Sequence, residues 1–306
     1  MGNFQPGWNF LALPQEFSSR DSAQVWVLPI PYEGTTSYGA GTRRGPAAII
    51  EASRQVETYD RRRRCEPCCE YGIATLAPVE IDMTSPEAMT AVIRRTVADL
   101  YEDGGPRLLV TLGGEHTVSV GVVRGLADRN VLPADAVVVQ IDAHADLRDT
   151  YENTPYSHAC AARRMAELFP IFQIGIRNIS EEGDRFRRDS GRIETVFADE
   201  LSSRNYLDEL AAFVAGKHVY LTIDLDGLDP SIMPAVGTPE PGGLTWDQTI
   251  AVCDVIARNA ARVAGFDVVE LAPLPGISGP DFIAAKLVYE AATRFVMDAA
   301  SEDAGT

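Results

Sequence analysis

Short apolar runs alternate with helix-like segments along most of this chain, and that alternation limits its fold more than any other feature. The runs lie at residues 25–30, 107–112, 136–141, 171–176, 219–223 and 264–269, with weaker ones at 73–76 and 195–198. Segments with helical periodicity lie at residues 86–102, 118–129, 159–168, 206–215, 246–259 and 281–299. Strands that are apolar throughout and separated by helices indicate a parallel sheet covered on both faces. The sequence therefore predicts one doubly wound α/β sheet of eight strands.

The composition is that of a folded protein with one domain. Hydrophobic residues make up 45% of the 306 residues and charged residues 23%, both near the averages of globular proteins. No repeat, low-complexity tract or Pro/Gly/Ser-rich linker divides the chain. We expect a single domain over residues 1–306, with an N-terminal extension at 1–22 and a tail at 300–306.

Charge and cysteine content argue against several classes of partner. The net charge of −17 would repel nucleic acid and anionic lipid and attract a cationic substrate. Neither a membrane-spanning run nor a secretory pattern is found, so we expect a cytoplasmic protein that binds neither nucleic acid nor membrane. Cys65, Cys68 and Cys69 resemble half a zinc site, but no further ligand is close in sequence, and loop thiols are the simpler interpretation.

Acidic residues and histidines gather where three of the predicted strands end. GGEH, with Glu115 and His116, follows the run 107–112. DAHAD, residues 142–146, follows the run 136–141, and DLDGLDP, residues 224–230, follows the run 219–223. Ligands of open α/β sheets collect at the carboxyl ends of the strands, so these segments are expected to meet.

This combination indicates a site for two metal ions. A single Asp-x-Asp after a strand is usually a turn or a helix cap, and a single histidine there is usually a satisfied core residue. Four clustered carboxylates, however, repel one another unless they are protonated or bind cations. Two divalent ions about 3.5 to 4 Å apart would remove that repulsion and activate a water. Carboxylates with a minority of imidazoles fit manganese better than metals that prefer thiolates.

The three motifs, in this order and spacing, resemble those of the ureohydrolases, the arginase and agmatinase family. Further matches are PYEGTTSYGAGTRRGPAAI near the start, VGTPEPGGLT after the third motif and DVVELAP at the last strand. The similarity extends over about residues 25–299. It implies a three-layer α/β/α sandwich around an eight-stranded parallel sheet, and assembly into a homo-oligomer, a trimer or hexamer.

The resemblance also implies roles for individual residues. Two Mn²⁺ ions per subunit would be held, the first by His116, Asp142, Asp146 and Asp224, and the second by Asp142, His144, Asp224 and Asp226. Asp142 and Asp224 would bridge them. Glu270 would bind a guanidinium, Thr238 would line the pocket, and His158 would shuttle protons. Asp146 would accept a proton from the attacking water and pass it to the leaving amine.

Two loops bear on the substrate. LRDTYENTPYSHACAARR, residues 147–164, and GIRNISEEG, residues 175–183, lack the pattern of arginases, with Asn178 and Ser180 where acids would be expected. SHACAARR looks more like agmatinases. We therefore predict hydrolysis of the small cationic guanidine agmatine to urea and putrescine. Guanidinobutyrate, aminopropylagmatine, arginine and formiminoglutamate stay open as substrates, as does a non-catalytic role. Glu152, Glu181 and Glu182 are candidate contacts for a distal amine.

Overall fold

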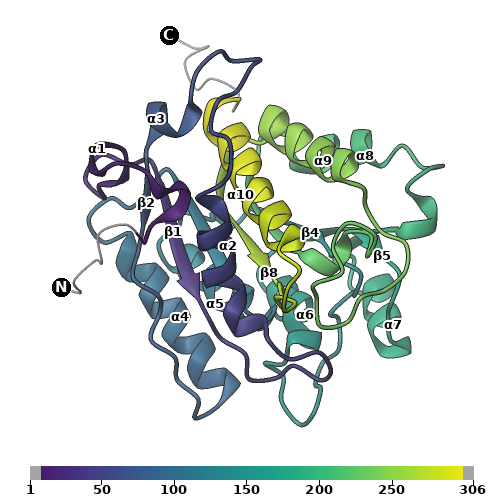
Figure 1. The fold of residues 1–306 in the computed structure, drawn as a ribbon. Helices are drawn as coiled ribbons and strands as arrows, with labels where there is room; N and C mark the ends of the chain where they lie inside the picture. The colour runs from purple at the N-terminus through teal and green to yellow at the C-terminus, as the bar shows by residue number, and fades with distance from the viewer. Residues whose placement is uncertain (1–7, 299–306) are drawn as a thin grey trace.

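One parallel sheet of eight strands forms the centre of the computed structural model, which describes residues 8–298 (Figure 1). Its strand order is β2-β1-β3-β8-β7-β4-β5-β6, and every neighbouring pair is parallel, as predicted. The strands are β1 (Val25–Ile30), β2 (Ile73–Thr75), β3 (Leu108–Gly113), β4 (Val137–Ile141), β5 (Ile171–Ile176), β6 (Ile193–Phe197), β7 (His218–Asp224) and β8 (Arg262–Val269).

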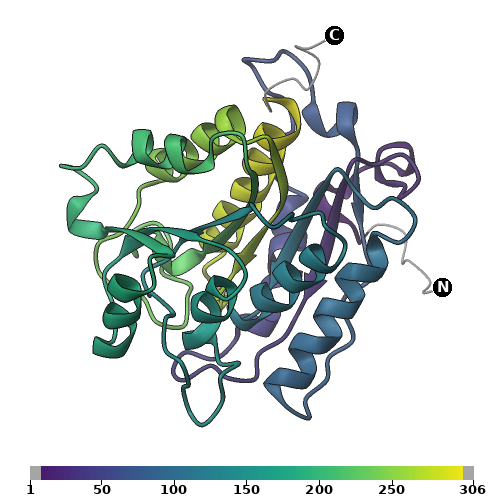
Figure 2. The same ribbon diagram turned by 180° about the vertical axis from the view of Figure 1, so that it is seen from behind.

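Helices cover both faces of this sheet (Figures 1 and 2). One layer contains α2 (Gly45–Ser53), α8 (Tyr206–Val214), α9 (Trp246–Asn259) and α10 (Gly279–Met297). The opposite layer contains α4 (Pro86–Leu100), α5 (Thr117–Asp128), α6 (Ala161–Ala166) and α7 (Glu181–Asp189). The short helices α1 (Gln15–Ser18) and α3 (Pro67–Tyr71) lie near the β2 edge. None of the helices within residues 8–298 is long and apolar enough to cross a membrane.

The strands are buried on both sides because their side chains alternate between two hydrophobic cores. Val25 and Val27 of β1 belong to the core under α2 and α10, whereas Trp26 and Leu28 belong to the core under α4 and α5. This explains why the strands are apolar throughout rather than at every second position. Polar caps fix where the outer helices begin: the Ser85 side chain accepts the N–H of Ala88 at the start of α4.

The short helices α1 and α3 and the longer helices α2 and α7 were not predicted. The sequence Gly45-Pro46 at the start of α2 reads as a turn, yet proline is well suited to the first turn of a helix. Helix α7 is mostly charged and buries only Gly183, so it has no apolar stripe. Its N-terminus is capped by Ser180. The tail at 300–306 lies outside the described residues, and within the proposed extension Phe10 is fully buried.

The strand order places the ends of the motif-bearing strands side by side. β3, β8, β7 and β4 are consecutive in the sheet although they come from distant parts of the sequence. Because all strands are parallel, their carboxyl ends share one edge. The residues that follow these four strands therefore surround a common space.

Candidate metal and active site

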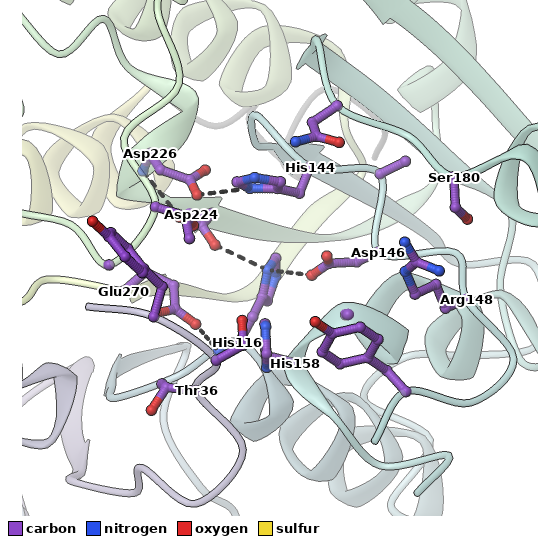
Figure 3. Close-up of a pocket in the computed structure, with 18 of the residues that line it drawn as sticks. Thr36, His116, His144, Asp146, Arg148, His158, Ser180, Asp224, Asp226 and Glu270 are labelled. Atoms are coloured by element: carbon purple, nitrogen blue, oxygen red, sulfur yellow. Dashed lines mark hydrogen bonds and ion pairs between the residues drawn. The ribbon is translucent and has the colours of Figure 1, made fainter. Parts of the chain in front are cut away.

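A cavity of about 240 Å³ opens at the carboxyl edge of the central strands (Figure 3). Most of the residues predicted for the site line it. They are His116, His144, Asp146, His158, Asp224, Asp226, Thr238 and Glu270. Asp142 does not line the cavity and is completely buried next to it.

His116 is the meeting point of three carboxylates. Its Nδ1 lies 3.1 Å from Asp142 Oδ2 and 3.2 Å from both Asp146 Oδ2 and Asp224 Oδ2. The same nitrogen is buried and has no hydrogen-bond partner of good geometry. Asp146 reaches it because its backbone adopts a left-handed conformation, with φ of 51°. A nitrogen lone pair and three carboxylates directed at one point form a suitable set of metal ligands.

The far side of the His116 ring fixes which nitrogen can bind a metal. Its Nε2 is 2.9 Å from Thr222 Oγ1, and Thr222 donates its hydroxyl hydrogen to Asp267 Oδ1 at 2.6 Å. Because that hydrogen is committed, Nε2 must donate to Thr222. In the neutral ring Nδ1 therefore carries the lone pair, as a metal ligand requires.

A second group of ligands lies beside the first and shares Asp142 with it. It consists of Asp142, His144 and Asp226, whose ligand atoms lie within 4.8 Å of one another. His144 Nδ1 is 2.9 Å from Asp226 Oδ2 and 3.8 Å from Asp142 Oδ1, whereas the other oxygen of Asp142 faces His116. Asp142 is thus placed to bridge two ions. Asp224, the other predicted bridge, belongs only to the first group, and its Oδ1 accepts the Asp226 N–H.

The protonation equilibria show how unfavourable these charges are without a cation. Burial, followed by repulsion from Asp226, raises the pKa of both Asp142 and Asp224. Burial disfavours the charged ring of His144, but its hydrogen bond to Asp226 outweighs burial and raises the pKa of His144 to about 10. Protons therefore neutralise the site when metal is absent, and divalent ions would compete with them.

Glu270 lies directly after β8 and faces the same cavity. Its backbone is left-handed, with φ of 67°, and its N–H donates to the Gly114 carbonyl at 2.7 Å. One oxygen of the Glu270 carboxylate accepts the backbone N–H of His116 at 2.7 Å. Burial, with repulsion from Glu115, raises the pKa of Glu270, so a cationic group placed beside it would favour its charged form.

His158 and Thr238 complete the wall of the cavity. His158 begins a 3-10 helix, His158–Cys160, after the loop that follows DAHAD. Thr238 lies next to Gly237, which packs so tightly on Gly39 that an added Cβ at Gly39 would lie 2.6 Å from the Gly237 carbonyl. The two glycines allow the loop after β1 and the loop after β7 to close over the site together.

Some lining residues were not given a role from the sequence. Tyr38, Arg148 and Tyr151 line the cavity, and the Arg148 guanidinium lies 5.3 Å from the centre of the Tyr151 ring. All three lie within or near the quoted motifs, but nothing in their spacing indicates where they point. The acids considered for a distal amine, Glu152, Glu181 and Glu182, do not line this cavity.

Comparison with known proteins gives consistent results. The sequence model of the Arginase family matches residues 23–293. An N(1)-aminopropylagmatine ureohydrolase of Synechocystis sp. is 40% identical over 92% of this chain and 94% of its own. An agmatinase of Pyrococcus horikoshii is 31% identical over 87% and 90%. The crystal structure of agmatine ureohydrolase of Thermoplasma volcanium superimposes with a TM-score of 0.80 at 30% identity, covering 95% of both chains.

Proposed function

The chain belongs to the arginase family and is a ureohydrolase, and we propose that its substrate is N1-aminopropylagmatine, which it would split into urea and spermidine. The observation that carries this choice is the difference in sequence identity between two groups of relatives. Aminopropylagmatine ureohydrolases from three genera are 35–40% identical, whereas the agmatinases compared are 30–31% identical. This proposal replaces the sequence-based preference for agmatine with another of the alternatives considered.

The residues that line the cavity are compatible with a long cation. Tyr38 is 82% exposed at the rim, and Tyr151 lines the wall, so two aromatic rings border the path away from the metal groups. Aromatic faces attract ammonium groups without fixing their distance from the guanidino end. The carboxylates that line the cavity are Asp146, Asp224, Asp226 and Glu270, all close to the reacting end.

The residues of the site would divide the reaction among them. Arginase-family enzymes use two metal ions, and two Mn²⁺ ions held by the groups around His116 and His144 would supply Lewis-acid activation of water. Glu270 would hold the planar guanidinium through paired N–H donors. Asp146 would accept a proton from the attacking water. As the bond between the guanidino carbon and the alkyl-bearing nitrogen breaks, Asp146 would pass that proton to the nitrogen, and His158, as the proton shuttle, would supply the second proton with which the amine departs as an ammonium.

A second candidate substrate has a carboxylate at its far end, as in 4-guanidinobutyrate. Arg148 lines the cavity, and no ion pair of its side chain is found within residues 8–298. A guanidinium without a carboxylate partner could bind the acid of such a substrate. Substitution of Arg148 by Met would abolish this activity but would favour a polyamine substrate.

The test is urea release by the Mn²⁺-loaded enzyme. Aminopropylagmatine, agmatine, 4-guanidinobutyrate and arginine are compared by kcat/KM, with formamide release measured for formiminoglutamate. We expect the highest kcat/KM with aminopropylagmatine, no activity in the Asp142→Asn variant, and two manganese ions per wild-type subunit by elemental analysis. A higher kcat/KM for agmatine or guanidinobutyrate would overturn the substrate proposal. Light scattering would test the expected trimer or hexamer.

A further inference from the structure

The loop after β1 is tied to a buried carboxylate that neither metal group uses. Glu115 of the GGEH segment is completely buried. Its Oε2 accepts the backbone N–H groups of Gly34 at 2.8 Å and Thr35 at 2.7 Å, and its Oε1 lies 2.7 Å from Thr35 Oγ1. A carboxylate only accepts hydrogen bonds, so the Thr35 hydroxyl hydrogen points to Glu115.

Thr35 Oγ1 then has only lone pairs left for its other neighbour, His158. It accepts the backbone N–H of His158 at 3.0 Å and lies 3.2 Å from His158 Nδ1. Because its hydrogen is committed to Glu115, the contact with Nδ1 is a hydrogen bond only when Nδ1 carries the hydrogen. Ser157 Oγ, 3.3 Å from the same nitrogen, can accept from it or donate to it, so only the Thr35 contact distinguishes the two tautomers. That contact requires the lone pair of the neutral ring to be on Nε2.

We propose that Thr35, fixed in place by Glu115, is a positioning residue that sets the tautomer of His158. The inference rests on the proposed function, in which His158 protonates the departing amine. With Nδ1–H held by Thr35, the ring gains and gives its second proton at Nε2 alone. In the opposite tautomer a neutral ring carries a hydrogen at Nε2 and cannot accept a proton there. An edge-on contact with Tyr151, with ring centres 5.8 Å apart, limits turning of the ring.

Three segments that are distant in sequence therefore act on one proton. Thr35 comes from the exit of β1, Glu115 from the exit of β3, and His158 from the loop between β4 and α6. His158 lines the same cavity as His116 and Asp146 (Figure 3). The GGEH motif would thus contribute twice, with a metal ligand and with the acid beside it.

Substitutions at Thr35 separate the hydroxyl from the shape of the side chain. Thr35→Val removes the hydroxyl but keeps the volume, and should lower kcat at least about tenfold while KM changes little, since proton transfer alone is impaired. Thr35→Ser keeps the hydroxyl and should retain most of kcat. Thr84→Val is the control, because the Thr84 hydroxyl also binds an acid, Asp82, but Thr84 is exposed and neither residue lines the cavity. A normal kcat for Thr35→Val would refute the proposal.

A double-mutant cycle tells positioning from a general loosening of the loop. In a His158→Ala background, Thr35→Val should change kcat by less than about twofold, because its effect passes through the missing ring. The same loss of kcat in both backgrounds would mean that Thr35 only holds the loop, and the proposal would fail.

The tautomer of His158 can be determined by NMR without substrate or metal. In the metal-free protein labelled with ¹⁵N-histidine, the His158 signals are those that vanish in His158→Ala. We expect a protonated Nδ1 and an unprotonated Nε2 in the wild type, and a mixture of tautomers in Thr35→Val. A wild-type ring protonated at Nε2 alone would overturn the positioning role whatever the substrate. The expected tautomer without urea release from any guanidine would instead refute the proposed function.

Discussion

Substitution of Arg177 should reveal how strongly the metal-bearing loops depend on one half-buried cation. The Arg177 guanidinium donates to the carbonyls of Gly175 at 2.9 Å, Asp226 at 2.6 Å and Glu240 at 3.1 Å, with longer contacts to Gly227 and Leu228. It therefore joins the end of β5 to the segment that carries Asp226 and to the loop after it. Arg177→Met keeps much of the aliphatic stem and removes every one of these donors.

The expected loss follows from the number of bonds. Hydrogen bonds to a charged group contribute about 1.5–3 kcal/mol each, and the half-buried position of Arg177 lets water replace part of them. We therefore expect the free energy of unfolding to fall by about 3–5 kcal/mol. An unfolding entropy of roughly 2.1 cal/mol/K per residue over 306 residues converts this loss into a melting temperature about 5–8 °C lower.

Calorimetry of the metal-free protein measures this shift, and titration with Mn²⁺ measures the second consequence. Because Asp226 is displaced with its loop, manganese affinity should fall about tenfold. Arg258→Met is the matched control, because the Arg258 side chain is 70% exposed and its ion pair with Asp254 is long at 3.9 Å. The free energy of unfolding should change by less than about 0.5 kcal/mol in this variant. A melting temperature within about 1 °C of the wild type for Arg177→Met would refute the reasoning.

Three further substitutions have defined outcomes. Thr222→Val removes the acceptor for His116 Nε2, so calorimetric titration should show manganese affinity lowered about tenfold to a hundredfold, whereas Thr222→Ser should bind normally. Glu270→Gln removes the charge that a guanidinium needs, and kcat/KM should fall at least about a hundredfold with both ions still bound by elemental analysis; unchanged kcat/KM would contradict this role. Burial alone would raise the pKa of Glu290, but hydrogen bonds from Arg294 and Lys286 outweigh burial and lower this pKa. The charged Glu290 therefore stabilises the folded protein above the ordinary pKa of 4.5, and this contribution is lost as pH falls through the depressed pKa. Glu290→Gln should therefore lower the melting temperature at pH 7 and have much less effect near pH 3, which thermal unfolding at both pH values checks.

Most strands were predictable because they are buried on both faces; the edge strand β6, in which Glu194 is exposed, gave a weaker apolar run. Trp26 and Val27 point to different cores, and such a strand is apolar at every position whatever its neighbours are. Helix α7 was not predictable in the same way, because ion pairs such as Arg188–Asp184 and the cap at Ser180 stabilise it without an apolar stripe. Burial leaves a periodic pattern in a sequence, whereas ion pairs and caps leave only scattered polar residues.

The ligand residues could be named from their motifs, but their partners could not. The contact of Asp146 with His116 depends on a left-handed backbone at Asp146, and an aspartate at this position does not by itself predict that conformation. The link from Glu115 through Thr35 to His158 requires three strand exits to meet, so it depends on strand order rather than on spacing. Asp224 was expected in both metal groups, and only the folded backbone shows its second oxygen bound to the Asp226 N–H.

The position of β8 bears on how the protein is made. β8 is the last strand along the chain, yet it lies between β3 and β7 in the sheet. A chain emerging from the ribosome therefore has β2, β1 and β3 on one side and β7, β4, β5 and β6 on the other, each with an open edge, before β8 is available. His116 at the end of β3 and Asp224 at the end of β7 can meet only after β8 inserts. Incomplete chains would thus lack the complete group around His116, and loading of both ions would wait for the final stage of synthesis.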